Sequence, residues 1–227
     1  SVNGHTLRGT KESATTENDS FIIYNEALKS WVEATDPESR FRFKDDTLPV
    51  LLELNYNAAY SSALSRMPMK ARLVGSEDSN PFPSFVSKKI TNIVGIQSRL
   101  TILTDNSIVL SEVNDPFNFF KQSVLVDLMD DVIDLESTDG GLGRFKYVNT
   151  HNRDLLITTD NAQLKMSGSN PLTPTNASIY TVARHTVETT IAPVAYGADV
   201  LYAIDYGGSS GIIKYSASDS SNEKDHI

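Results

Sequence analysis

The chain has 227 residues, of which 39% are hydrophobic and 22% charged, so it is long enough to bury a core and has a globular composition. The absence of cysteine excludes disulfides, thiolate-ligated zinc and catalysis by a cysteine nucleophile. The formal net charge of −9 argues against tight nucleic-acid binding, which needs Lys and Arg to displace phosphate counterions. No apolar run approaches the roughly 18 residues of a membrane helix, so we expect no membrane insertion by this segment.

The N-terminal third is predicted to be a flexible polar segment followed by an extended region. Residues 1–20 are rich in Ser, Thr, Asn and Gly. Residues 21–35 hold two apolar clusters, FIIY and WV, a pattern that fits either an amphipathic helix or a hairpin. RFRF at 40–43 alternates as a strand does, and TLPVLLEL at 47–54 is apolar and extended. GSEDSNPFPSF at 75–85 contains two prolines and a polar cluster, which predict a loop.

The rest of the chain is repetitive. Three stretches, 93–113, 145–168 and 192–218, follow one plan of strand, tight turn, strand, tight turn, strand. The first two share Thr-Asp-Asn at the second turn (104–106 and 159–161), where Asp and Asn tolerate left-handed backbone angles. The two turns are 55 residues apart, and an aspartate at the matching place in the third stretch follows 45 residues later.

This spacing predicts a mainly β fold with β-propeller-like, repeated antiparallel blades, because units of roughly 40 to 50 residues are typical of propellers. Independent hairpins of a sandwich are the alternative. Each segment between the repeats is long enough for one further strand. Three repeats cannot close a ring of about four to eight blades, so other sequence must supply the rest. The predicted regions are a flexible segment 1–20, an N-terminal mixed or extended β-rich region with its loop 21–85, a partial propeller 86–218 and a polar tail 219–227.

Three phenylalanines crowd into four positions after an Asp-Pro step, in the stretch SEVNDPFNFFKQS at 111–123. Asn114 or the following aspartate can cap a short helix here, and proline suits the first helical position. We expect this turn to cover a strand edge or to fill the gap between neighbouring blades, with at least two of the rings buried. The predicted structural anchors are Asp115, Pro116, Phe117, Phe119 and Phe120.

Negative charge is concentrated in residues 111–140, which hold eight carboxylates and one base, Lys121, for a net charge of −7. The run lacks the Asp-x-Asp-x-Asp-Gly order of a calcium loop. We therefore interpret it as an acidic surface that serves repulsion or solubility rather than metal binding. Its residues are Asp127, Asp130, Asp131, Asp134, Glu136 and Asp139.

Motifs that could carry chemistry fail on their context. GGSSG at 207–211 matches the nucleophile elbow, but an elbow needs a following helix, whereas IIKYS is strand-like, so we interpret it as a hairpin loop. The four histidines are widely spaced, and His151 is expected in a turn. Paired carboxylates leave glycoside hydrolysis as an alternative. The sequence predicts no catalytic residue, no cofactor and no metal site.

Five elements in a fixed order carry a resemblance to a known family. They are Asn80 to Phe85 (NPFPSF), Arg99–Leu100, Ser111 to Phe119, Asp131 to Asp134 and Leu172 to Pro174. Together they resemble tail tubular protein B, the nozzle protein family of short-tailed bacteriophages (podophages). WVEAT at 31–35 and the TLPVLLEL stretch also look like the family's upstream region, so the similarity covers about residues 30 to 216. Family members are considerably longer, and this chain begins at Ser1 rather than Met, so we expect a processed chain or a portion of a longer protein.

The resemblance implies a non-enzymatic structural virion protein. It implies a homohexameric tube in the phage tail, below the portal and the tail adaptor protein and within reach of tail fibres, through which genomic DNA leaves. The DNA would pass transiently without specific binding, and the protein would occupy the host cytoplasm during assembly. A receptor- or glycan-binding propeller is the alternative, and clustered Tyr and Trp would favour it, but Trp31 is the only tryptophan.

Overall fold

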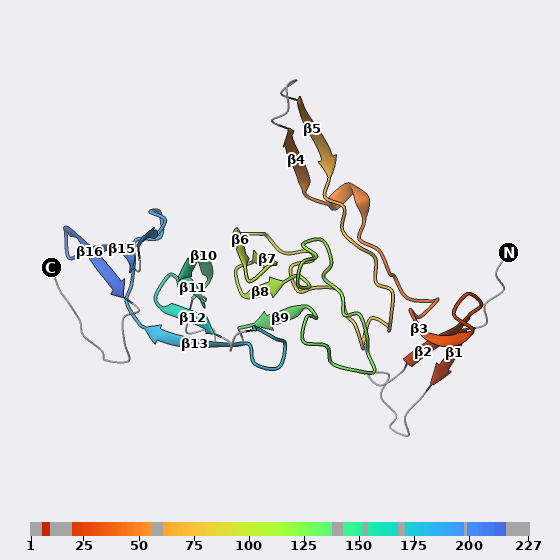
Figure 1. The fold of residues 1–227 in the computed structure, drawn as a ribbon. Helices are drawn as coiled ribbons and strands as arrows, with labels where there is room; N and C mark the ends of the chain where they lie inside the picture. The colour runs from red at the N-terminus through yellow and green to blue at the C-terminus, as the bar shows by residue number, and fades with distance from the viewer. Residues whose placement is uncertain are drawn as a thin grey trace.

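A computed structural model shows a chain of β-strands joined by turns and long loops (Figure 1). It describes residues 6–9, 20–55, 61–137, 143–151, 154–167, 171–197 and 199–216. The strands in these ranges are β1 (Thr6–Gly9), β2 (Ser20–Asn25), β3 (Ser30–Ala34), β4 (Val50–Asn55), β5 (Ser61–Arg66), β6 (Asn92–Ile96), β7 (Arg99–Leu103), β8 (Ser107–Leu110), β9 (Ile133–Glu136), β10 (Phe145–His151), β11 (Asp154–Thr159), β12 (Gln163–Ser167), β13 (Ser178–Ala183), β14 (Val194–Tyr196), β15 (Asp199–Tyr206) and β16 (Ser209–Ser216). A short 3-10 turn, η2 (Asp45–Thr47), precedes β4, and these ranges contain no α-helix. The prediction of a mainly β fold is confirmed.

Each predicted repeat forms its own antiparallel sheet. The first repeat sheet has the order β6-β7-β8-β9, the second β10-β11-β12-β13, and the third β14-β15-β16. The predicted three-strand plan is therefore confirmed in all three stretches. The segments that follow the first and second repeats supply their fourth strands, β9 and β13. Two smaller sheets, β1-β2-β3 and β4-β5, precede the repeats.

The three repeat sheets pack face to face in a row (Figure 1). Strand β10 contacts β6 and β7 of the first repeat sheet and β14 and β15 of the third. Along β11, Leu155 and Ile157 belong to the core shared with the first repeat sheet, whereas Leu156 belongs to the core shared with the third. Successive side chains of a strand point to opposite faces, so the second sheet is buried on both faces. This explains the continuous apolar run in β11.

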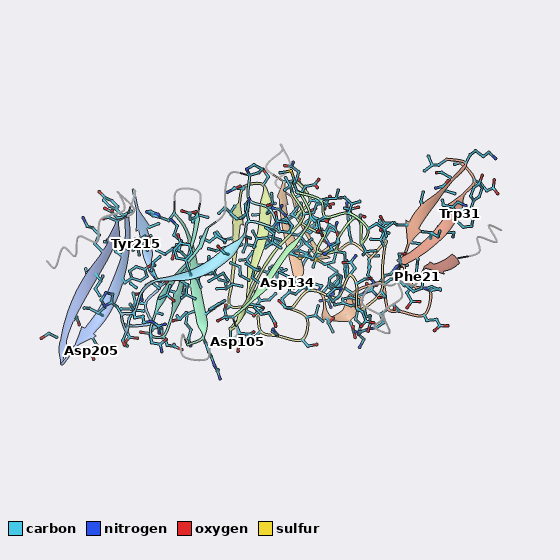
Figure 2. The ribbon with its side chains drawn as sticks, turned by 90° about the horizontal axis from the view of Figure 1, so that it is seen from below. Phe21, Trp31, Asp105, Asp134, Asp205 and Tyr215 are labelled. Carbon is cyan, nitrogen blue, oxygen red and sulfur yellow. The ribbon has the colours of Figure 1, made fainter. Side chains whose placement is uncertain are left out.

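The two Thr-Asp-Asn turns share a structure that depends on threonine. The Oγ1 atom of Thr104 accepts a hydrogen bond from the Ser107 N–H at 3.0 Å, and Thr159 does the same for Ala162 at 2.9 Å. Neither turn uses the left-handed backbone angles that Asp and Asn tolerate, because no residue of either turn has a positive φ. The threonine hydroxyl closes the turn locally, so Asp and Asn need no unusual angle. Asp105 and Asp205 lie at corresponding hairpin ends of the first and third repeat sheets (Figure 2).

Left-handed residues occur at two other hairpin turns. Gln97 and Ser98, between β6 and β7, have φ of 44° and 60°. Gly207 and Gly208, between β15 and β16, have φ of 60° and 94°. Positive φ at both central residues is the geometry of a type I′ turn, whose twist matches that of the flanking strands. Gly207 and Gly208 of GGSSG thus form a two-residue hairpin loop, and Ser209, the serine of the elbow-like motif, is the first residue of β16.

The N-terminal region departs from the sequence prediction in two places. Thr6–Gly9 pairs with β2, so part of the segment 1–20 predicted as flexible is a strand. RFRF at 40–43 is not a strand; Phe43 packs on the core formed with Phe85 and Phe119, whereas Phe41 is exposed. The choice left open for 21–35 resolves to a hairpin, β2–β3. Trp31 lies there, at the other end of the molecule from the third repeat sheet (Figure 2).

Candidate functional site

The elements that carry the family resemblance are far apart in sequence but meet around the first repeat sheet. Ile102 of β7 and Val109 of β8 point away from the second repeat sheet and form a core with Phe85 and Phe119. Loop residues from the N-terminal region, including Phe43, pack on this core. We call the ring cluster at this place the aromatic junction; it comprises Phe43, Phe82, Phe85, Phe119 and Phe120.

The predicted helix around Pro116 is wrong, because residues 113–120 contain two short turns, at 113–114 and 116–117, and no helix. The Asn118 N–H donates to the Asp115 carbonyl oxygen at 3.2 Å, closing a β-turn with proline at its second position, which suits its preset φ. Neither expected cap residue acts as one. Asn114 has a left-handed φ of 60°, and the Asp115 carboxylate pairs with the Lys70 ammonium.

Two of the three phenylalanines are buried. Phe119 is 2% exposed and Phe120 1% exposed, whereas Phe117 is half-buried. The Phe119 ring meets that of Phe85 edge to face at 5.1 Å between centroids, and the Phe120 ring meets that of Phe82 at 5.2 Å. We expected these rings to cover a strand edge or to fill the gap between neighbouring blades. The space they fill lies instead between one face of the first repeat sheet and the N-terminal loops.

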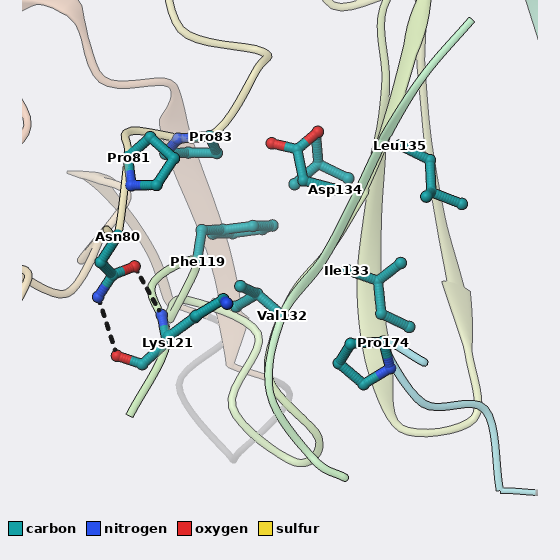
Figure 3. Close-up of a pocket in the computed structure, with 11 residues that line it drawn as sticks. Asn80, Pro81, Pro83, Phe119, Lys121, Val132, Ile133, Asp134, Leu135 and Pro174 are labelled. Atoms are coloured by element: carbon teal, nitrogen blue, oxygen red, sulfur yellow. Dashed lines mark hydrogen bonds between the residues drawn. The ribbon is translucent and has the colours of Figure 1, made fainter. Parts of the chain in front are cut away.

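Asn80 holds the NPFPSF loop against the segment that follows the phenylalanines (Figure 3). Its Nδ2 donates to the Lys121 carbonyl oxygen at 3.1 Å, and its Oδ1 accepts from the Lys121 N–H at 3.0 Å. Nδ2 also donates to the Val74 carbonyl at 3.1 Å. A side-chain amide whose NH₂ group and carbonyl oxygen both have hydrogen-bond partners costs little free energy to bury. Here the Asn80 amide joins the two loops, as paired backbone groups join two strands.

The same loop also holds strand β9. The Ser84 N–H and hydroxyl donate to the two carboxylate oxygens of Asp134, at 2.7 Å and 2.5 Å. Lys88 forms an ion pair with Glu136, two residues further along β9. Side chains at alternate positions share a face of the strand, so both carboxylates of β9 face the loop.

Arg99 is a buried charge that the sequence reasoning treated only as part of a motif. It is 2% exposed, and its guanidinium donates to four backbone carbonyl oxygens. The acceptors are those of Ser111 (2.7 Å), Asp131 (2.6 Å), Met129 (3.2 Å) and Leu172 (3.3 Å). Burial lowers the pKa of Arg99, and nearby carboxylates partly offset this. One side chain thus joins β7 to the acidic loop and to the Leu-Thr-Pro segment.

Arg72 is a second buried arginine, at the aromatic junction. Its guanidinium donates to the carbonyl oxygens of Asn80, at 2.9 Å, and of Arg40. It also lies 5.4 Å from the Phe82 ring centroid and 6.0 Å from that of Phe120, a favourable cation–π arrangement. The apolar neighbours of this base in ARLV, residues 71–74, are the sequence signal that could have identified it.

The acidic residues do not all lie on the surface. Asp131 is 2% exposed, which corrects its assignment to an acidic surface. Its carboxylate accepts from the Gln122 N–H at 2.9 Å and the Leu128 N–H at 3.4 Å, so it shapes the loop. Burial raises the pKa of Asp131, although these hydrogen bonds oppose the shift. Asp127 and Asp130 are exposed, and Asp139 lies outside the described residues.

We expect the Asp131→Ala variant to lose about 1–3 kcal/mol of unfolding free energy, because two backbone N–H groups lose their acceptor. Chemical denaturation measures this loss. The matched control is Asp130→Ala, whose side chain is exposed, and its stability should change by less than about 0.5 kcal/mol. Equal effects of the two substitutions would contradict the assigned role of Asp131.

An open cavity of about 210 Å³ lies between the NPFPSF loop and β9 (Figure 3). Its walls are mainly apolar, with Asp134 and Lys121 as the two charged residues. The other lining residues are Asn80, Pro81, Pro83, Val109, Phe119, Val132, Ile133, Leu135 and Pro174. Every segment of the resemblance except Arg99–Leu100 contributes to this wall.

The described residues form no metal-binding group at this cavity. No group of three or more His, Asp or Glu side chains in the described ranges is arranged to hold a metal ion. His151 lies at the end of β10, beside the predicted turn, with its ring 5.7 Å from that of Tyr215. It therefore packs between the second and third repeat sheets.

Comparison with known proteins identifies the family. The model of the bacteriophage nozzle protein family matches residues 1–226. The chain belongs to this family. It is also 24% identical to tail tubular protein gp12 of Escherichia phage T7 over 215 residues, which are 95% of this chain and 27% of that protein. The chain thus spans about a quarter of the length of this curated relative.

Nozzle proteins are structural, non-enzymatic components of the phage tail, so the family resemblance read from the sequence is confirmed. The motifs that carried it are those that build the aromatic junction and the cavity wall. In the described part of this nozzle chain, no helix is long and apolar enough to cross a membrane.

Proposed function

We propose that this chain is part of a subunit that assembles into a homohexameric tail tube, through which genomic DNA leaves the virion. The family match over nearly the whole chain carries this proposal. The tail adaptor protein and tail fibres are the proposed neighbours, and the DNA passes transiently without specific binding.

The distribution of charge supports a conduit that does not retain DNA. This part of each copy carries a net charge of −9, and six copies multiply it. Arg72 and Arg99 are buried and bonded to carbonyl oxygens, so these two bases cannot displace counterions from phosphates. The exposed carboxylates Asp127 and Asp130 repel a polyanion over about 8–10 Å at physiological salt.

We also propose that the region 86–218 is part of a β-propeller. Three four- or three-stranded sheets pack face to face, and β10 lies against the first strands of both neighbours, β6 and β14. A radial arrangement would bring corresponding strands together in this way. The outer face of the third repeat sheet carries exposed Val194, Tyr196 and Ile212, an apolar face that a further blade would cover.

In this assembly the aromatic junction joins the region 21–85 to the propeller. The proposed structural anchors are the residues predicted from the sequence, with Phe119 and Phe120 as the buried core of the joint. Asp115 contributes through its ion pair with Lys70, which ties the turn to the N-terminal loops. The remaining proposed regions, 1–20 and 219–227, fall largely or wholly outside the described residues.

Sedimentation and negative-stain imaging of the full-length protein test the proposal. We expect a hexameric ring, and no retention of double-stranded DNA at physiological salt. A monomer would contradict the tube and favour the receptor- or glycan-binding alternative, for which glycan binding that is lost in Trp31→Ala would be the supporting result. Trp31 is half exposed and stacks edge to face on Tyr24, so this variant should still fold.

A further inference from the structure

Strands β4 and β5 form a two-stranded hairpin, here called the arm, that projects from the body of the molecule (Figure 1). One face of the arm is apolar. Val50, Leu52 and Leu54 alternate along β4 and are 53%, 55% and 52% exposed, and Leu64, opposite Leu52, is 73% exposed. The other face carries Leu51, which is partly buried, together with Glu53 and small or polar residues of β5.

The arm lacks a supporting surface within its own chain. Among the described strands, β4 and β5 make extended contact only with each other, and neither belongs to a buried core cluster. An isolated two-stranded hairpin is at best marginally stable in water. An exposed row of large aliphatic side chains on such a hairpin indicates a surface that another molecule covers.

The same chain contains a mainly apolar cavity that could accept these aliphatic side chains, the cavity between the NPFPSF loop and β9. Its volume of about 210 Å³ exceeds the roughly 150 Å³ that accepts a benzene molecule, so leucine side chains fit. Charges also match. Arg66 lies opposite Val50 and thus on the apolar face of the arm, while the cavity presents the Asp134 carboxylate, which is exposed and retains free lone pairs beside its Ser84 bonds.

We propose that the arm of one copy docks in the cavity of a neighbouring copy, with Leu52 and Leu54 in the apolar pocket and Arg66 beside Asp134. A projecting arm on one surface and its receptor on another make a heterologous contact, which closes a ring when the rotation between copies allows it. This inference rests on the proposed tube and adds the surfaces that join its subunits.

Two experiments on the full-length protein test the contact. The double variant Leu52→Ser with Leu54→Ser should raise the concentration needed for ring assembly at least tenfold, with its melting temperature as a check of folding. Ala63→Ser, on the opposite face of the arm, is the matched control and should assemble normally. The side chains of Leu52, Leu54 and Ala63 are all exposed, and the substitutions therefore leave the described core intact.

Cross-linking gives a second readout, because this part of the subunit contains no cysteine, and any cysteine elsewhere in the full-length protein is first replaced by serine. Leu52→Cys in one tagged copy and Pro174→Cys in another should form an intersubunit disulfide, whereas Ser65→Cys with Pro174→Cys should form little. A ring that assembles unchanged with the serine variant and gives no cross-link would overturn the arm contact while leaving the tube intact. A wild-type protein that stays monomeric would overturn the tube and the contact together.

Discussion

Replacing Arg99 by methionine is expected to lower the free energy of unfolding by about 3–5 kcal/mol, one of the two largest effects that we expect for a single substitution. The guanidinium donates hydrogen bonds to four carbonyl oxygens. They belong to Ser111, directly after β8, to two residues of the acidic loop and to Leu172 of the Leu-Thr-Pro segment. A buried acceptor without a donor costs about 1–3 kcal/mol. Methionine also removes the cost of burying a charge, which offsets part of the loss. Urea denaturation measures the difference.

Arg42→Met is the matched control. Arg42 is exposed, with its guanidinium over the Phe41 ring, so the substitution should change stability by less than about 0.5 kcal/mol. Arg99→Lys should also be strongly destabilising, because one ammonium cannot reproduce a planar fork of five donors. A lysine variant as stable as the original would show that charge, rather than the carbonyl network, is what the site needs.

The repeats were predictable because their signal is local. Alternating apolar residues and turn residues specify each strand without knowledge of its neighbours, which is why β6 to β8, β10 to β12 and β14 to β16 fell where expected. Pairing of β9 and β13 with these sheets depends on long-range contacts that periodicity does not report. The helix at Pro116 failed for a related reason: the Asn118 side chain accepts a hydrogen bond from the Phe120 N–H, a local contact that competes with helical hydrogen bonds.

The site was less predictable than the fold. Composition identified an acidic run, but it could not distinguish Asp131 from its neighbour Asp130. Asp131 is buried and accepts hydrogen bonds from two backbone N–H groups, whereas Asp130 is exposed. Both arginines that organise the site are bonded to carbonyl oxygens, and a carbonyl acceptor leaves no trace in the sequence. The three phenylalanines were identifiable because aromatic residues at this density need a buried partner surface.

Truncating Phe119 to alanine tests that aromatic junction directly, and we expect a loss of about 3–5 kcal/mol in unfolding free energy. The ring contacts Phe85 edge to face and packs with Ile102 and Val109, so its removal leaves a void between the first repeat sheet and the N-terminal loops. The surrounding turns are held by Asn80 and Asn118, so they can collapse only partly into that void. Thermal and chemical unfolding measure the loss.

Phe117→Ala supplies the comparison, because it removes an identical ring two residues away that is only half-buried. Its cost should be smaller, about 1–2 kcal/mol, since a partly exposed ring loses less contact and leaves no enclosed cavity. If the two variants lost stability equally, the density of phenylalanines rather than the packing of Phe119 would set the strength of the joint. A melting temperature unchanged by Phe119→Ala would mean that the N-terminal loops and the first repeat sheet are held together by their hydrogen bonds alone.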